Sequence, residues 1–137
     1  GADLSGAYLR EVYLRSANLT GANLAGADLR TGDLRYATLD ASSLAGADLT
    51  EASIQEGSLR DADLRGANLT QTDLRLTDLV GAQIDDATQM SAGQRLVFEL
   101  VNNGGINRDL SNQFLGWANL SGVDLSGANL SGADLPG

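Results

Sequence analysis

Large aliphatic side chains recur at every fifth position along most of this chain. From Leu4 to Ile84, all 17 of these positions hold Leu or Ile. The residue two places earlier is small in nearly every repeat and is most often Ala, with Val12 as the one larger exception. The other three positions of each repeat are mostly polar or Gly. The apolar pattern therefore has a unit of five residues.

A period of five fits neither a regular helix nor a straight strand. On an α-helix each step of five turns the side chain by about 140°, which would scatter the leucines around the axis. On a strand an odd spacing would send alternate leucines to opposite faces. Within one repeat, however, the small residue and the leucine are two apart, which places both on one side of an extended segment. The pattern predicts a chain that turns once per repeat and coils around its own leucines.

A longer period in the outward-facing residues indicates how many sides the coil has. Glycines and arginines recur in columns 20 residues apart, at Gly6, Gly26, Gly46 and Gly66, and at Arg15 and Arg35 with Arg75 two steps further on. Twenty residues hold four repeats. The simplest coil therefore has four sides.

Seven of the repeats before residue 86 begin with Ala-Asp-Leu or Ala-Asn-Leu, starting at Ala2, Ala17, Ala22, Ala27, Ala47, Ala62 and Ala67. This A(D/N)LXX motif resembles that of the pentapeptide repeat family, and the uninterrupted Leu-type repeats look most like its cyanobacterial members. The resemblance implies an all-β fold, a right-handed quadrilateral β-helix, which agrees with a four-sided coil. It also implies that many relatives have no assigned activity and that some act as regulators through protein–protein contact.

We expect one solenoid domain with a single interruption. Residues 1–86 form the first repeat block, residues 87–107 a helix-plus-loop insertion, and residues 108–137 a second block whose leucines have moved by one position. Ser91 suits an N-cap and Gly104 a C-terminal stop, so a helix is predicted between them. The turn that follows departs from the motif, because Arg108 and Gln113 occupy the positions two residues before the leucine, where most repeats have a small residue.

The predicted helix carries Leu96, Val97, Leu100 and Val101 on one face. About twelve residues of helix are too short to be stable alone in water, so this face must dock. On one interpretation the helix packs on the coil as a plug or cap, and on the other it projects to bind a partner. For the second interpretation the candidate partner surface is Arg95, Phe98, Glu99, Asn102, Asn103, Phe114 and Trp117.

Composition excludes several kinds of chemistry. The chain has no Cys and no His, which removes disulfides, thiolate nucleophiles, zinc sites of the usual ligand set and imidazole acid–base catalysis. No nucleophile motif or phosphate-binding glycine loop is present, so we expect a non-enzymatic protein without a cofactor. No segment approaches 18 consecutive apolar residues. The chain begins inside a repeat, which we interpret as a trimmed or partial chain, and the compartment stays open between cytoplasm, periplasm and thylakoid lumen.

The polar columns have both structural and binding interpretations. Asp or Asn before each leucine could form rows of carboxylates, but these side chains also suit tight corners, where they bond nearby amides. The free exchange with Ser and Thr favours the corner role. Arg15, Arg35 and Arg75 could form a patch that binds an anion. Asp33 and Asp73 lie on the same face, however, and favour a solvent-exposed series of ion pairs.

The net charge of −9 disfavours direct nucleic-acid binding and favours another protein as partner. We expect a protein-binding or regulatory scaffold. One alternative, which the family resemblance implies, is a DNA-mimicking modulator of a type II topoisomerase, although the negative charge here is spread over the faces and not gathered in a stripe. Another is a structural rod or end-to-end homodimer, because open coil ends expose apolar core and unpaired backbone.

Overall fold

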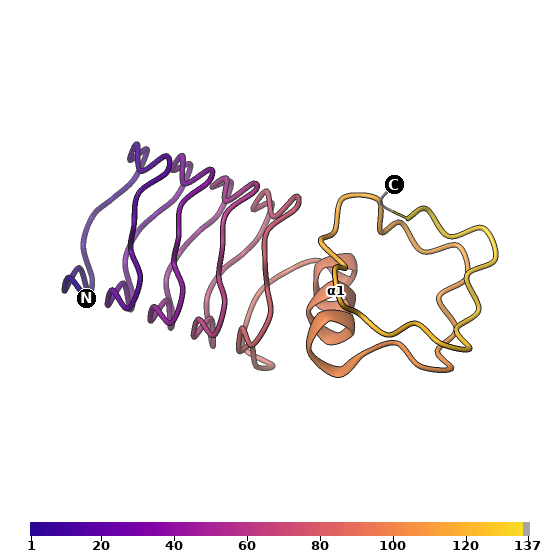
Figure 1. Cartoon of the computed structure of the whole chain (residues 1–137). Helices are drawn as coiled ribbons and strands as arrows, with labels where there is room; N and C mark the ends of the chain where they lie inside the picture. Colours follow the sequence, from indigo (N-terminus) through magenta and orange to yellow (C-terminus); the bar gives the residue numbers. More distant parts are fainter. Residues whose placement is uncertain (136–137) are drawn as a thin grey trace.

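The first part of the chain forms a stack of coils, each 20 residues long. The computed structural model describes residues 1–135. Parallel bridges join residues 20 apart, from Asp3 with Asn23 to Asp63 with Gln83, so each coil contains four pentapeptides. Within the described residues the pairing consists of single bridges, one on each face, and no longer strand forms. The stack is seen from its side in Figure 1.

The leucines of successive coils pack on top of one another inside the stack. Leu24 and Leu44 are fully buried, as are the leucines between them, and Ile54 continues the series. The small residues two places earlier, such as Ala27 and Ala47, are also buried. Burying one such leucine contributes about 1.5–3 kcal/mol, so the stack is stable through its repeated interior. The prediction of a coil built around the leucine ladder is confirmed.

Each corner of the coil is a hydrogen-bonded turn. The N–H of Ala7 donates to the carbonyl of Leu4 at 3.1 Å, and Gly6 between them has φ +63°. Such turns require positive φ at this place, which favours Gly. The side chain before the leucine completes the corner, since Asp3 accepts the N–H of Ser5 at 3.1 Å and Asn18 accepts that of Thr20 at 3.0 Å. The corner role expected for Asp and Asn is confirmed.

One corner at the end of the first block contains an extra residue. Gln89 pairs with Asn68 across 21 residues, so paired backbone extends past residue 86, the expected end of the block. The Asp85 carboxylate accepts the N–H of Gly66 and of Thr88, both at 2.9 Å, and these bonds lower the pKa of that carboxyl. This corner accounts for the whole change of phase. From Met90 to Leu110 the spacing is again 20 residues, the length of one coil.

The helix α1 spans Ala92–Asn103 and takes the place of most of that coil. Ser91 is its N-cap, in a capping box with Gln94, and Gly104 with φ +73° ends it. The helix predicted between Ser91 and Gly104 is therefore confirmed. The interpretation as a docked element is also confirmed, because Val97, Phe98 and Leu100 are buried in the core.

Two amide side chains of α1 bond to the backbone of the coil beneath it. Gln94 Nε2 donates to the carbonyl of Thr72 at 3.0 Å. Asn102 Oδ1 accepts the N–H of Gly81 at 2.6 Å, and its Nδ2 donates to the carbonyl of Leu79 at 3.3 Å. In lower coils the groups equivalent to Thr72 and Gly81 pair with backbone of the next coil. These side chains therefore satisfy groups that the interrupted stacking would leave unpaired.

The second block resumes the coil from Gly105. The N–H of Gly105 donates to the carbonyl of Asp124 at 2.9 Å, the same pattern as Leu4 with Asn23, so Gly105 stands in a leucine place. Figure 1 shows this block as an open ring while the first block is seen from its side, so the two coil axes are not parallel. A backbone bond from the N–H of Leu76 to the carbonyl of Trp117, at 2.9 Å, joins the blocks directly. In the described part of the chain, no helix is long and apolar enough to cross a bilayer.

Candidate functional site

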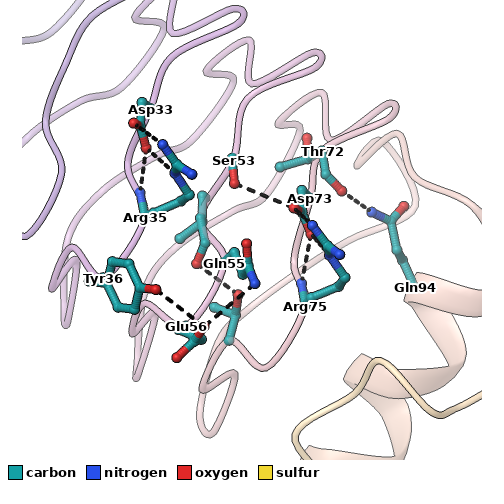
Figure 2. A network of polar contacts seen from close by, with 12 residues as sticks. Asp33, Arg35, Tyr36, Ser53, Gln55, Glu56, Thr72, Asp73, Arg75 and Gln94 are labelled. Atoms are coloured by element: carbon teal, nitrogen blue, oxygen red, sulfur yellow. Dashed lines mark hydrogen bonds and ion pairs between the residues drawn. The ribbon is translucent and has the colours of Figure 1, made fainter.

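Two of the three arginines in the column, Arg35 and Arg75, are paired with carboxylates of the same face. Arg35 Nε and Nη2 donate to the two oxygens of Asp33 at 2.7 and 2.6 Å, and Arg75 forms the same fork on Asp73 at 2.9 and 2.8 Å (Figure 2). The fork from Arg35 lowers the pKa of Asp33 to about 2. Arg15 lies over the ring of Tyr36, 4.8 Å from its centroid. The guanidinium groups of Arg35 and Arg75 therefore already have an anionic partner.

Between the two forks the face is polar but carries no further arginine. Ser53 Oγ donates to Asp73 at 3.5 Å, which links neighbouring coils (Figure 2). Tyr36 Oη donates to Glu56 at 3.4 Å, and Gln55 Nε2 donates to the same carboxylate at 3.5 Å. These bonds are long, and the two to Glu56 are solvent-exposed, so each contributes little to stability. This face consists of local pairs, which leave little unmatched positive charge.

The candidate residues on α1 divide between docking contacts and solvent. Arg95 donates to the carbonyls of Asp85 and Thr88, the latter at 2.8 Å, and thereby ties α1 to the extra-residue corner. Glu99 accepts from Arg108 at 3.2 Å and ties the helix to the second block. Asn103 is exposed.

Phe98 corrects the partner surface expected from the sequence. Its side chain is only 2% exposed and lies in the core with Val97 and Leu100. The helix turns its apolar face onto the coils, and Phe98 shares that face. Asn102 is likewise occupied, because it bonds the backbone of Leu79 and Gly81. Phe98 is therefore unable to contact a partner while α1 stays docked.

Phe114 and Trp117, by contrast, border a groove at the junction of the two blocks. The groove has a volume of about 510 Å³, and its walls come from residues 71–75 of the first block, the start of α1 and the first coil of the second block. Phe114 is 68% exposed, so a large apolar side chain lies in solvent at the edge of this groove. Trp117 is partly buried. Asp73 and Arg75 form the polar wall opposite.

Sequence reasoning missed two residues, one in a wall of this groove and one paired with Phe114 at its edge. Gln94 is 8% exposed, and it both closes the capping box and bonds Thr72, as Figure 2 shows for the second contact. The Ser-x-x-Gln spacing from Ser91 was a local signal for the first role. Asp134 is the second, since it pairs with Phe114 across the coil. The pairing of Asp134 with Phe114 depends on how the repeats of the second block are aligned with one another.

Comparison with known proteins agrees with this architecture. The model of the family described as pentapeptide repeats matches eight copies over residues 1–35, 33–66, 58–88 and 107–137. A pentapeptide repeat protein of Nostoc Pcc 7120 is 37% identical, with a TM-score of 0.54 over 59% of this chain and 71% of that one. A pentapeptide repeat protein of the Arabidopsis thaliana thylakoid lumen is 28% identical, with a TM-score of 0.61 over 90% of this chain and 80% of that one.

Other comparisons add less. The plasmid-mediated fluoroquinolone resistance protein QnrB1 is 15% identical over 98% of this chain and 67% of its own, with a TM-score of 0.40, a likeness too weak to inform function. A search of curated proteins gave no match. The similar solved structures imply a right-handed β-helix. With matched repeats over most of its length, the chain belongs to the pentapeptide repeat family.

Proposed function

We propose that this protein is a non-enzymatic binding scaffold that recognises another protein at the groove between its two blocks. The observation that carries the proposal is the exposure of Phe114, 68%, at the edge of a groove of about 510 Å³. Aromatic side chains next to a concave surface are the usual anchors of protein interfaces. Tyr8 and Tyr13 are also exposed, at 93% and 88%, but they are not among the residues that line this groove.

The groove is held by contacts that do not depend on a ligand. Gln94 fixes the start of α1 to Thr72, and the bond from Leu76 to Trp117 fixes the second block to the first. Both bonds lie beside the groove, whose walls include Gln94, Thr72 and Trp117. A partner would therefore meet a preformed surface, which reduces the entropic cost of binding.

A photo-crosslinking experiment tests this location. With p-benzoylphenylalanine at position 114, we expect a discrete crosslinked protein in an extract of the cells that produce the chain, and we expect excess unmodified chain to remove it. The same group at position 8 is the control, because Tyr8 is 93% exposed on the first coil, well away from the junction. Equal crosslinking at both positions, or none at position 114, would contradict the proposal.

Point substitutions suit this question better than removal of the insertion. A deletion of residues 87–107 would take away Val97, Phe98 and Leu100, which belong to the core, together with the Gln89 pairing. Loss of binding in that variant would not separate a lost surface from a lost fold. Phe114→Ser changes an exposed side chain, and its fold is checked by circular dichroism.

The alternative of topoisomerase modulation by DNA mimicry receives less support. Mimicry requires a continuous row of free carboxylates. Here Asp28, Asp33, Asp63 and Asp73 are each neutralised by an arginine of the same face. A supercoiling assay with purified gyrase is the direct test, and inhibition or protection at micromolar protein would favour this alternative over the scaffold.

A further inference from the structure

Asp134 differs from the other corner side chains of the coil. At every other described Asp or Asn that precedes a leucine, the side-chain oxygen accepts the backbone N–H two residues later, as Asp124 does from Ser126 at 2.9 Å. Two residues after Asp134 stands Pro136, which has no amide hydrogen. The usual backbone donor is therefore missing at this corner, and no residue among 1–135 bonds the Asp134 carboxylate in its place.

The chain itself shows what a carboxylate in this place can bind. Four aspartates at the equivalent position of their repeats hold a guanidinium between their two oxygens, in the pairs Asp28 with Arg30, Asp33 with Arg35, Asp63 with Arg65, and Asp73 with Arg75. Each of these arginines stands two residues after its aspartate. After Asp134 that place belongs to proline, so the chain supplies no arginine there.

An aromatic residue is paired with Asp134. Phe114 is its direct neighbour across the parallel bridge. The carboxylate lies over Gly116, where an added Cβ would stand 2.9 Å from Asp134 Oδ2, and Trp117 follows next in the chain. The stacking of a guanidinium on an aromatic ring has a precedent in this protein, in Arg15 over Tyr36.

We propose that this corner binds an arginine side chain of a partner protein, with the guanidinium forked on Asp134 and stacked against Phe114. The inference rests on the proposed scaffold function and specifies the chemistry of its contact. A net charge of −9 attracts a basic partner, and the planar guanidinium suits both a carboxylate fork and an aromatic face. Lysine lacks this planar fork.

The test uses the whole chain and two acetylated, amidated peptides that differ only in one central residue, arginine or its uncharged analogue citrulline. Trp117 is the single tryptophan, so its indole N–H signal in a ¹H–¹⁵N NMR titration reports binding at this corner. We expect a saturable shift with the arginine peptide and none with the citrulline peptide. Asp134→Asn and Phe114→Ala should each weaken binding about tenfold, because each removes half of the contact.

Asp124→Asn is the matched control, because Asp124 stands at the same place two repeats earlier and keeps its bond from Ser126. It should leave the affinity unchanged. Equal responses to the two peptides, no saturable response, or equal losses in Asp134→Asn and Asp124→Asn would each overturn the inference. If crosslinking at position 114 persists while the arginine peptide does not bind, the arginine contact is wrong and the scaffold function stands.

Discussion

Leu100 of α1 fills the interior position that Gly105 leaves vacant in the second block. Gly105 stands where the other repeats carry leucine, and its N–H bonds the carbonyl of Asp124 in the leucine register. A Cβ at Gly105 would lie 2.5 Å from Leu125 Cδ2 and 3.0 Å from Leu100 Cδ2. The helix thus provides one of the interior side chains of the coil that follows it.

We predict that both residues of this pair are sensitive to substitution. Leu100→Ala should lower the free energy of unfolding by about 2–5 kcal/mol, because it opens a cavity at a fully buried site. Gly105→Ala should cost about 1–3 kcal/mol through overpacking. Urea denaturation measures both. Ser121→Ala, at an exposed position of the same block, is the control and should change stability little.

Gln94 should be a second sensitive position. Gln94→Leu keeps the apolar bulk but removes the bond to the Thr72 carbonyl and the side-chain half of the capping box, so we expect a loss of about 1–3 kcal/mol. The exposed Gln71, on the adjacent corner, is the matched control as Gln71→Leu. Equal stability of the two variants would show that Gln94 does not fasten the helix to the coil.

The Arg–Asp forks predict loss of stability in acid. Arg30 holds the pKa of Asp28 at about 2, below its ordinary value of 3.8, and Arg35 does the same for Asp33. A carboxyl whose pKa is lower in the folded state stabilises the fold above its unfolded pKa, and this contribution is lost as the pH falls from about 4 toward 2. Urea midpoints at pH 5.5 and pH 2.5 should therefore differ. Asp28→Asn should reduce the difference, and an unchanged difference would argue against the fork.

Corner glycines should resist β-branched substitution even where space is available. Gly46 has φ +66°, and an added Cβ would meet nothing within 4 Å. We expect Gly46→Val to destabilise by about 1–2 kcal/mol through backbone strain alone. Ala45 is one residue earlier and is not among the residues with positive φ, so Ala45→Val should lower the free energy of unfolding by less. A smaller loss at Gly46 than at Ala45 would contradict the strain argument.

Most of the regular fold could be predicted because each repeat carries its own local signal. A leucine at every fifth place requires a turn in each repeat, and the 20-residue columns match the observed pairing of Asp3 with Asn23. The helix was equally visible, since Ser91 and Gly104 mark its ends. The continuation of pairing to Gln89 was hidden, because the Asp85 carboxylate accommodates an extra residue that breaks the sequence period.

The candidate site was predictable only in part. Phe114 and Trp117 stood out as aromatics beside an irregular segment, and both border the groove. Phe98 was wrongly assigned to the same surface. It is buried because of the way α1 docks on the coils, and no local sequence pattern specifies that docking. The facing residues Asp73 and Gln94 are far apart in sequence, so their meeting at the groove follows only from the three-dimensional arrangement.

The extra residue at the Asp85 corner and the coil-length span from Met90 to Leu110 together let the helical segment replace one coil of the solenoid. A segment that occupies one coil's length and bonds the backbone below through amide side chains changes the direction of the solenoid, and the coil that follows accommodates it by carrying Gly105 where Leu100 enters. Transplanted between coils of a regular repeat protein, with its longer corner, such a module would give designers a bent rod with a ready-made concave surface at the bend.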